Sequence, residues 1–380
     1  MTRFLHLYRR YWPDEGGIES VIRSVAEYTA ALGHDVTALV CSRFPWTRQE
    51  THESVRVVRC ATVGTVANTP LSPPMALWLR RLQPQLIELH HPYPFGLWAL
   101  LQSGYRGPLV LHYHMDISRF GRLQALFRPT LDRALARADC IIASSRGYAE
   151  TSPVLGPWLD KCVFIPPSVD PARLCLDAAS QERLAQRPPH GRGQVLFVGR
   201  LTPYKGLPDL LRAMQWVEGD LSIVGRGELA GHLPRLAAEL GVAERVRFLG
   251  RLSEQDLVHE YHAADVVVLP SVGRGEAVGI VQVEAMLCGK PVVCSDLPGV
   301  CEVGEEGVTC TVFPHGDARA LADRINELII DPDRRVRMGA AGRQRALAHY
   351  SPRVLLARHL EVYAGLLGSP LTGGMQDGTA

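Results

Sequence analysis

Short apolar runs alternate with amphipathic or polar stretches along the whole chain, and this alternation predicts strands and helices in turn. In the first half, residues 18–32 carry apolar positions at helical spacing and end at Gly33, a common helix stop. The predicted strands of this half are residues 3–8, 36–40, 86–89, 109–112, 140–143 and 163–166. Strands that alternate with helices favour a parallel sheet with helices on both of its faces.

The second half repeats this order of elements. Its predicted strands are residues 195–198, 221–224, 246–249, 266–269, 291–294 and a short one near Thr311. Residues 171–194 between the halves show no strand signal and are predicted to be a linker. The pattern therefore predicts an α/β protein of two Rossmann-like domains, residues 1–175 and 193–350, that face each other across a cleft. Residues 351–367 are predicted to form an amphipathic helix, and residues 368–380 to fray.

Length and composition support this division and exclude several classes of protein. A chain of 380 residues is too long for one ordinary core, and 46% hydrophobic residues can fill two. The net charge of +2 argues against a nucleic-acid binder. Nine cysteines without a C-x-x-C pair are typical of reduced thiols in a cytoplasmic protein. No signal peptide precedes the first predicted strand and no long apolar stretch follows, so we expect a soluble or peripheral protein.

Two glutamates eight positions apart carry the strongest functional signal. Glu276 falls in the loop after the predicted strand 266–269, and Glu284 lies about two turns inside the helix that Gly289 ends. Ligands of open α/β sheets bind at such strand ends, where a helix N-terminus presents free N–H groups to an anion. A carboxylate inside a largely buried helix needs partners, which ribose hydroxyls would supply. The alternative is a surface glutamate followed by an ordinary helix glutamate.

Two cations follow another strand end. Arg200 and Lys205 come directly after the predicted strand 195–198, where cations are well placed to meet an anion. Departure of a nucleoside diphosphate creates negative charge that such groups stabilise. Carboxylates for sugar hydroxyls together with cations for a diphosphate suit a nucleotide-sugar. The alternative is a pair of solvated loop cations.

At this point the chain resembles a known family. The pairing of G-R-L-x-x-x-K-G, from Gly199, with E-x-x-G-x-x-x-x-E, from Glu276, resembles the retaining GT-B glycosyltransferases of family 4. The pair Gly16-Gly17 matches the N-terminal glycines of that family. Residues 90–94 and 112–116 are similar to its H-H-P-x-P and H-x-D stretches, especially those of bacterial polysaccharide mannosyltransferases. Val278 departs from the family pattern, which usually has an aromatic residue there.

The resemblance implies a role for each matching residue. Glu276 would contact the transferred hexose and Glu284 the ribose, while His114 would line the sugar pocket near the primary hydroxyl. Arg251 would lie near the base. The backbone that would meet the donor's diphosphate belongs to Gly16, Gly17, Val278, Gly279 and Ile280. The residues expected to act in catalysis are His114, Arg200, Lys205 and Glu276. Gly16-Gly17 alone is equally typical of a tight turn.

No metal or other cofactor is expected. No D-x-D motif is evident beside the two predicted strand ends, so the two cations are expected to replace a metal, and the leaving phosphate to accept the acceptor's proton. A metal site of His112, His114 and Asp116 is the alternative, but no fourth ligand is obvious.

The resemblance favours GDP-mannose as the donor and a polyprenyl-diphosphate-linked glycan of bacterial surface polysaccharide as the acceptor. Open alternatives are a UDP-sugar donor (glucose, galactose or GlcNAc), a nucleotide-sugar epimerase or hydrolase, and a non-catalytic sensor. Arginines interleaved with apolar residues over 119–128 predict either a docked amphipathic helix or one that lies on the anionic inner leaflet of the cell membrane.

Overall fold

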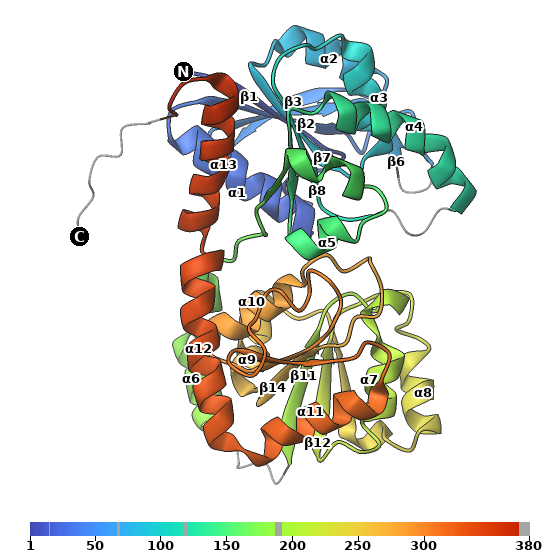
Figure 1. Cartoon of the computed structure of the whole chain (residues 1–380), viewed down its shortest axis with the longest axis vertical. Helices are drawn as coiled ribbons and strands as arrows, with labels where there is room; N and C mark the ends of the chain where they lie inside the picture. Colours follow the sequence, from blue (N-terminus) through green and yellow to red (C-terminus); the bar gives the residue numbers. More distant parts are fainter. Residues whose placement is uncertain (15, 67–68, 117–120, 187–191, 372–380) are drawn as a thin grey trace, which may run out of the picture. The chain divides into compact units, whose positions relative to one another are not determined.

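The computed structural model describes the chain except residues 15, 67–68, 117–120, 187–191 and 372–380, and it leaves the side chains of 121–126 undescribed. The chain divides into two units (Figure 1). The first unit consists of Met1–Pro167 with Pro352–Ala380, and the second of Ser168–Ser351. The boundary thus lies before residue 175, the expected end of the first domain.

The first unit is built on an eight-stranded sheet of order β10-β9-β8-β7-β1-β2-β4-β3. Every neighbouring pair is parallel except β3 with β4. The strands are β1 (Arg3–Leu7), β2 (Asp35–Cys41), β3 (Arg48–His52), β4 (Val55–Cys60), β7 (Leu86–His91), β8 (Leu109–Tyr113), β9 (Cys140–Ala143) and β10 (Cys162–Phe164). A separate antiparallel pair is formed by β5 (Gly64–Val66) and β6 (Thr69–Leu71).

Helices lie on both faces of this sheet, as the alternation of elements predicts (Figure 1). They are α1 (Gly17–Ala31), α2 (Pro74–Leu82), α3 (Pro94–Ser103), α4 (Gly121–Arg137), α5 (Arg146–Glu150), the 3-10 helix η1 (Gly156–Lys161) and α13 (Pro352–Leu367). The last of these, the predicted tail helix, packs against α1 although the whole second unit separates the two in sequence. Helix α1 ends before Gly33, whose φ of 85° places it in the left-handed region.

The second unit has a six-stranded, wholly parallel sheet of order β13-β12-β11-β14-β15-β16. Its strands are β11 (Gly193–Val198), β12 (Gly219–Val224), β13 (Val246–Gly250), β14 (Val266–Leu269), β15 (Val292–Ser295) and β16 (Cys310–Phe313). The direction of the strand order reverses between β11 and β14, so a topological switch point lies there. In open α/β sheets, ligands bind at the carboxyl ends of the strands beside such a point.

Burial on both faces explains the apolar runs of this sheet. Along β11, Val195 and Phe197 join one core cluster while Leu196 and Val198 join the other. The covering helices are α6 (Ala178–Ala185), α7 (Leu207–Ala213), α8 (Leu233–Glu239), α9 (Glu254–Ala263), α10 (Ile280–Leu287), α11 (Ala318–Ile330) and α12 (Pro332–Tyr350). Short 3-10 helices are η2 (Pro171–Leu174), η3 (Pro203–Lys205) and η4 (Ala243–Arg245).

The predicted linker over residues 171–194 is wrong for most of its described length. It contains η2, α6 and the start of β11. Asp177 accepts a hydrogen bond from the backbone N–H of Ser180 at 2.7 Å and so caps α6, a signal that the polar composition hid. Arg183 then pairs with Asp256 of α9 at 3.3 Å. These residues therefore pack onto the second unit instead of spanning freely.

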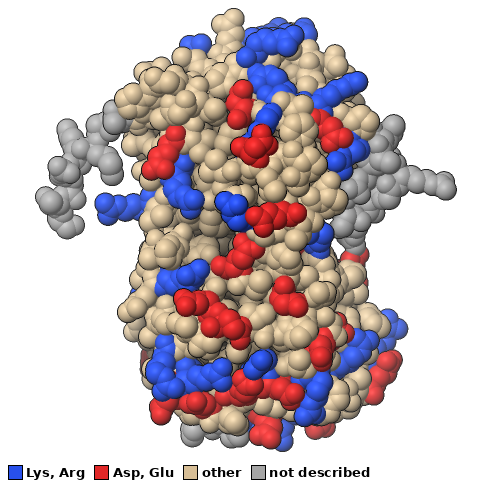
Figure 2. All heavy atoms as spheres, viewed as in Figure 1, with Lys and Arg blue, Asp and Glu red and all other residues tan. Residues whose placement is uncertain are grey.

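The visible surface has no large patch of a single charge sign. Figure 2 shows basic and acidic side chains intermixed over that face, in keeping with the net charge of +2. Among the described residues, none of the helices combines the length and apolarity that a membrane span requires.

We expect Gly206→Ala to destabilise the protein more than Gly241→Ala. Both glycines have φ near 70°, so alanine carries a similar conformational cost of about 1–2 kcal/mol at either site. A Cβ on Gly241 would meet nothing within 4 Å, whereas one on Gly206 would lie 1.8 Å from the Pro270 carbonyl oxygen. Urea unfolding of both variants measures the difference, which we expect to reach roughly 2 kcal/mol. Equal losses would show that the contact with Pro270 relaxes at no cost.

Candidate functional site

The loops after β11 and β14 meet at the switch point of the second unit. The two strands are neighbours, with Val195 beside Val266. Lys205 from the first loop forms an ion pair with Glu276 from the second, through the carboxylate oxygen Oε2. The same oxygen accepts a hydrogen bond from the Ser271 hydroxyl at 3.0 Å. Lys205 and Glu276 are only 7% and 8% exposed, so each charge depends on the other as its partner.

Backbone contacts hold the two loops together. The N–H of Val272 donates to the carbonyl of Tyr204 at 2.8 Å. Gly275 lies against the Tyr204 ring, where an added Cβ would come within 2.9 Å of the ring carbons. The ion pair therefore forms between loops that the backbone already joins.

Arg200 belongs to the same loop as Lys205 but points to the surface. Its guanidinium donates to the Tyr204 hydroxyl at 3.2 Å. An exposed cation beside a buried one places a second positive charge at the same strand end, where an anionic ligand can reach it.

Helix α10 begins directly after the glutamate loop. Gly279 precedes it with φ of 78°, and no side chain caps the helix there. A Cβ on this glycine would lie 2.2 Å from Leu269 Cδ2, which explains why the position requires glycine. Val278 and Gly279 are buried and Ile280 is half-buried. The uncapped N–H groups of the first turn suit an anion such as a diphosphate.

Glu284 lies on α10, half-buried among apolar neighbours. The Tyr261 hydroxyl donates to its Oε2 at 2.6 Å. Burial raises the pKa of Glu284, and the bond from Tyr261 opposes this shift without cancelling it. The predicted carboxylate inside a largely buried helix is therefore present, half-buried and with one oxygen held by the protein.

The predicted donor residues of the second unit gather at one edge of its sheet. Arg200, Lys205, Glu276 and Glu284 come from elements next to the switch point. Arg251 follows β13, two strands away from β11 at the same carboxyl edge. Gly16, Gly17 and His114 belong to the first unit, where Gly16-Gly17 opens α1 with both glycines exposed.

The metal hypothesis for His112, His114 and Asp116 is wrong in its choice of residues. Asp116 accepts hydrogen bonds from the hydroxyls of Tyr113 at 2.7 Å and Ser152 at 2.9 Å, away from the histidines. The structure instead brings His90 together with His112 and His114, all three buried, with one ligand atom of each within 4.8 Å of the others. The alternation of side chains along one strand puts only the pair His112 and His114 on one face. The neighbouring strand β7 supplies the third histidine, His90.

Sequence reasoning missed the rest of this polar cluster. Glu88 and His90 alternate on β7, as His112 of β8 alternates with His114 just beyond its end, and the register sets His90 beside His112. Polar residues at every second position of buried strands were a usable signal. His359 and Tyr363 of α13 could not be found in this way, because no local pattern ties α13 to these strands.

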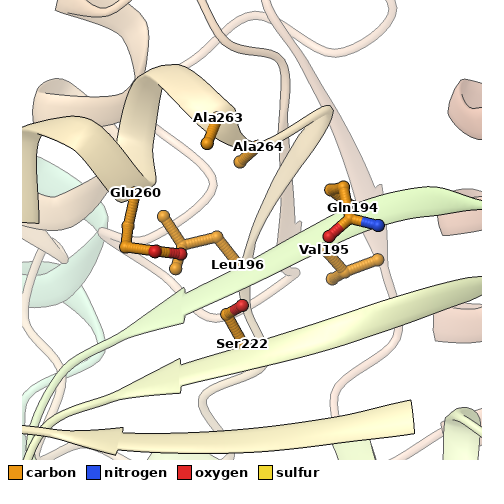
Figure 3. A pocket seen from close by; sticks show the side chains of 7 residues that line it. All are labelled: Gln194, Val195, Leu196, Ser222, Glu260, Ala263 and Ala264. Carbon is orange, nitrogen blue, oxygen red and sulfur yellow. The ribbon is translucent and has the colours of Figure 1, made fainter. Parts of the chain in front are cut away.

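A small pocket lies elsewhere in the second unit, between the start of β11, β12 and the end of α9 (Figure 3). Its lining is Gln194, Val195, Leu196, Ser222, Glu260, Ala263 and Ala264. Lys205 and Glu276 lie beyond the opposite, carboxyl end of β11, so the pocket is separate from the candidate site.

The predicted membrane segment falls partly outside the described residues. Arg119 and Phe120 are not described, and neither are the side chains of Arg122 and Leu123. At the other end, the Arg128 guanidinium donates to Asp132 at 2.7 Å, an ordinary pair one helical turn apart. The membrane hypothesis therefore stays a prediction.

Comparison with known proteins identifies the family. Residues 15–173 match the family described as Glycosyltransferase Family 4, and residues 180–345 match Glycosyl transferases group 1. The chain is 31% identical to the O-antigen chain mannosyltransferase C of Escherichia coli, over 97% of this chain and 99% of that protein. The chain belongs to glycosyltransferase family 4. It is a glycosyltransferase, as the motif pair predicts.

Other family members are named for different sugars and acceptors. The chain is 32% identical to the D-rhamnosyltransferase WbpZ of Pseudomonas aeruginosa, over 91% of this chain and 92% of that one. It is 36% identical to the GDP-mannose-dependent alpha-(1-6)-phosphatidylinositol monomannoside mannosyltransferase of Mycolicibacterium smegmatis, over 53% of this chain and 56% of that one. In fold it matches a sucrose-phosphate synthase from Thermosynechococcus elongatus with a TM-score of 0.80 at 22% identity, covering 97% of this chain and 100% of that one. The predicted GT-B architecture of two Rossmann-like domains is confirmed.

We expect Glu284→Gln to raise the melting temperature at neutral pH. Because the folded protein holds the pKa of Glu284 above its ordinary value of 4.5, the native state binds this proton more tightly than the unfolded state does. Stability is therefore lost as the pH rises from 4.5 through the raised pKa, and the loss persists above it. Glutamine cannot ionise but still accepts from Tyr261. Its Tm should exceed that of the wild type at neutral pH, and the difference should vanish near pH 4. A variant less stable than the wild type at every pH would contradict this.

Proposed function

We propose that this glycosyltransferase transfers mannose from GDP-mannose, with retention of configuration, to a polyprenyl-diphosphate-linked glycan in bacterial surface polysaccharide synthesis. The observation that carries the proposal is the buried Lys205–Glu276 pair beside the uncapped start of α10, at the switch point of the second sheet. A nucleotide-sugar offers a diphosphate to the cation and the helix N-terminus and hydroxyls to the carboxylate, and this site brings all three groups to one place.

The lysine and the helix act on the leaving diphosphate in this proposal. Departure of the nucleoside diphosphate concentrates negative charge on its terminal phosphate, and the Lys205 ammonium and the first turn of α10 stabilise that charge. Arg200 adds a second cation from the solvent side. Low exposure of Lys205 strengthens the effect, since the charge acts in a poorly screened environment. These groups would make a metal unnecessary, and the phosphate itself would take the acceptor's proton.

The two glutamates divide the remaining donor contacts. Lys205 and Ser271 both contact Oε2 of the Glu276 carboxylate, which leaves Oε1 for a hydroxyl of the hexose. Tyr261 occupies Oε2 of Glu284 and leaves its Oε1 for the ribose. Hydroxyl donors would offset the cost of keeping the Glu284 carboxylate charged in a buried place.

The family members support the choice of donor and acceptor. One relative is named for GDP-mannose dependence and a phosphatidylinositol mannoside, and another for mannosyl transfer to an O-antigen chain. A third is named for D-rhamnose, so the transferred sugar differs among proteins of similar identity. We therefore propose mannose and a lipid-linked glycan, with the enzyme docking on the cytoplasmic face of the membrane to reach it.

A donor panel tests the proposal. GDP-mannose, a GDP-6-deoxyhexose, UDP-glucose, UDP-galactose and UDP-GlcNAc are each incubated with a lipid-linked acceptor extract, with and without excess EDTA. We expect transfer from GDP-mannose, an α-linked product and largely unchanged rates in EDTA. Preference for a UDP-sugar would replace the donor assignment, and loss of activity restored only by Mg²⁺ or Mn²⁺ would overturn metal independence. Donor turnover without acceptor would indicate a hydrolase or epimerase, and binding without any turnover a sensor.

We expect Glu284→Ala and Glu276→Ala to separate nucleotide binding from sugar transfer. Loss of a ribose partner should weaken GDP binding by roughly tenfold in Glu284→Ala, about 1.4 kcal/mol. Glu276→Ala removes the counter-charge of Lys205 and frees this buried cation for the diphosphate, so GDP affinity should stay or rise. Its transfer rate should nevertheless fall at least about tenfold, since the hexose loses its contact. Calorimetry with GDP and a transfer assay measure both effects, and equal losses of GDP affinity would contradict the division of roles.

A further inference from the structure

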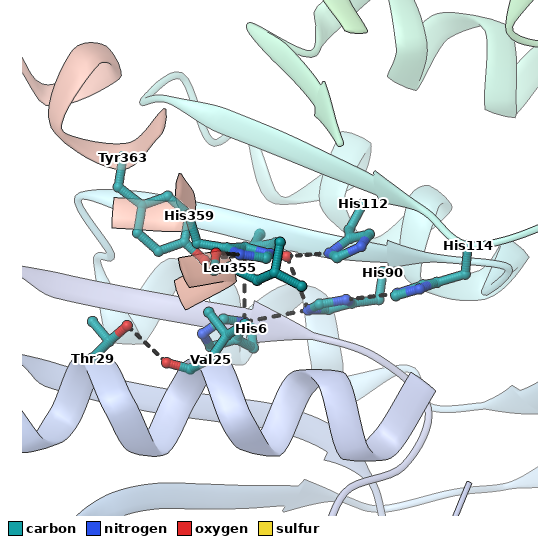
Figure 4. Close-up of polar contacts among 10 residues, drawn as sticks. His6, Val25, Thr29, His90, His112, His114, Leu355, His359 and Tyr363 are labelled. Atoms are coloured by element: carbon teal, nitrogen blue, oxygen red, sulfur yellow. Dashed lines mark hydrogen bonds and ion pairs between the residues drawn. The ribbon is translucent and has the colours of Figure 1, made fainter. Parts of the chain in front are cut away.

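A polar cluster lies inside the apolar core of the first unit (Figure 4). It combines His6 of β1, Glu88 and His90 of β7, His112 of β8, His114 just after the end of β8, and His359 and Tyr363 of α13. His6, Glu88 and His90 are at most 1% exposed, whereas His114 is 8% exposed and lies at the end of the cluster nearest to the surface. Groups this polar remain in a core only when they satisfy one another.

Three of the histidines, His6, His90 and His114, form a hydrogen-bonded row across neighbouring strands, the histidine file. His6 Nδ1 lies 3.3 Å from His90 Nε2, and His90 Nδ1 lies 3.1 Å from His114 Nε2. The register sets His6 beside Glu88 and His90 beside His112, so each contact of the file reaches two residues further along the neighbouring strand. Figure 4 shows the three rings in sequence, with His114 at the end.

The direction of these hydrogen bonds follows from the unpaired end of the file. A neutral imidazole carries one N–H, so His90, which uses both nitrogens, must donate with one and accept with the other. His6 Nε2 is buried and has no partner among the described residues. A buried N–H without an acceptor is rarer than a buried lone pair without a donor, so the proton of His6 belongs on Nδ1. His6 then donates to His90 Nε2, and His90 Nδ1 donates to His114 Nε2.

Glu88 does not reverse this direction. Its carboxylate is 3.8 Å from His6 Nδ1 and 3.7 Å from His90 Nε2, so it attracts a proton on either side of that bond about equally. His112 Nδ1 at 2.7 Å and the Tyr363 hydroxyl hold the carboxylate in place. Burial lowers the pKa of His6, His90 and His114, against the opposing attraction of Glu88, so all three rings are neutral near pH 7.

Ring orientation disfavours a metal held by His112 and His114 together. The rings of His112 and His114 stack with centroids 4.0 Å apart and an angle of 17° between their planes. Imidazole binds zinc in the plane of its ring at about 2.0–2.1 Å, which two stacked rings cannot do together. The His90–His114 separation of 3.1 Å is that of an ordinary hydrogen bond between two ring nitrogens.

We propose that His6 and His90 are positioning residues that hold His114 as the tautomer with its proton on Nδ1, so that Nδ1 donates a hydrogen bond to an oxygen of the bound sugar. His114 Nε2 is occupied by His90, and Nδ1 is the ring nitrogen that remains for a ligand. The partner bonded to one ring nitrogen decides which nitrogen carries the proton. This inference rests on the proposed contact between His114 and the hexose.

The tautomer can be measured directly in the ligand-free protein. Nitrogen NMR of protein labelled with ¹⁵N-histidine separates protonated from bare ring nitrogens, and comparison with His114→Gln assigns the signals of His114. We expect a protonated Nδ1 and a bare Nε2. In His90→Phe the ring of His114 loses its donor, and its proton should move in part or wholly to Nε2. His349→Gln, at an exposed position of α12, is the matched control and should leave these signals unchanged.

Each contrary result is decisive. A wild-type His114 protonated on Nε2 would overturn the proposal by itself. The proposal can therefore be refuted even if the His90→Phe protein misfolds. An unchanged tautomer in folded His90→Phe would overturn the role of His90. A stoichiometric transition metal in the purified protein would assign the cluster to metal binding instead.

Enzyme kinetics of His90→Phe distinguish a failure of this inference from a failure of the proposed function. If His114 donates to the sugar, His90→Phe should lower kcat/KM by roughly tenfold while GDP affinity stays unchanged. A correct tautomer together with unchanged kcat/KM would keep the hydrogen-bonded file but remove the contact between His114 and the sugar. Loss of GDP affinity would show that the substitution disturbs more than His114.

Discussion

Strands buried on both faces can carry a charged group only where another group neutralises or hydrogen-bonds it, and this constraint shapes both units. In the second unit β11 and β14 carry no charged residue, and the charges of the candidate site stand in the loops beyond the carboxyl ends of these strands. Lys205 and Glu276 are nevertheless buried there, and they are tolerated because they pair with each other. A ligand that competes for Lys205 must therefore replace what Glu276 supplies, which a phosphate can do.

The first unit meets the same constraint in another way. Its charges lie within the strands, where Glu88 is surrounded by histidines and by Tyr363. Burial alone would raise the pKa of Glu88, but the contacts with the surrounding histidines, among them the hydrogen bond from His112, outweigh burial and hold the pKa well below the ordinary value. The carboxylate thus stays charged inside a core, and the imidazoles around it acquire fixed orientations.

Helix α13 connects this cluster to the end of the chain. Tyr363 packs on Phe4 of β1 with ring centroids 5.2 Å apart and donates its hydroxyl to Glu88. The residues that support His114 therefore come from the first strand, the middle of the unit and the last helix. A family 4 glycosyltransferase that lacked this helix would leave Glu88 with one fewer donor in a place that water does not reach.

The sequence alone determined every strand of the second sheet, six of the eight strands of the first sheet, where β3 and β4 were missed, the GT-B architecture and the family. Apolar runs and glycine stops depend on local chemistry, and G-R-L-x-x-x-K-G and E-x-x-G-x-x-x-x-E are contiguous, so neighbouring positions suffice to find them. The start of α6 also had a local signal, Asp177, which the polar composition around it concealed. Only the tertiary structure decided that Glu276 lies on Lys205, that Asp116 is separate from the histidines, and that His6, His90 and His114 form a file. Those contacts depend on which strands become neighbours and on where α13 packs, and residues 275 positions apart, such as Glu88 and Tyr363, leave no trace of their contact in the local pattern.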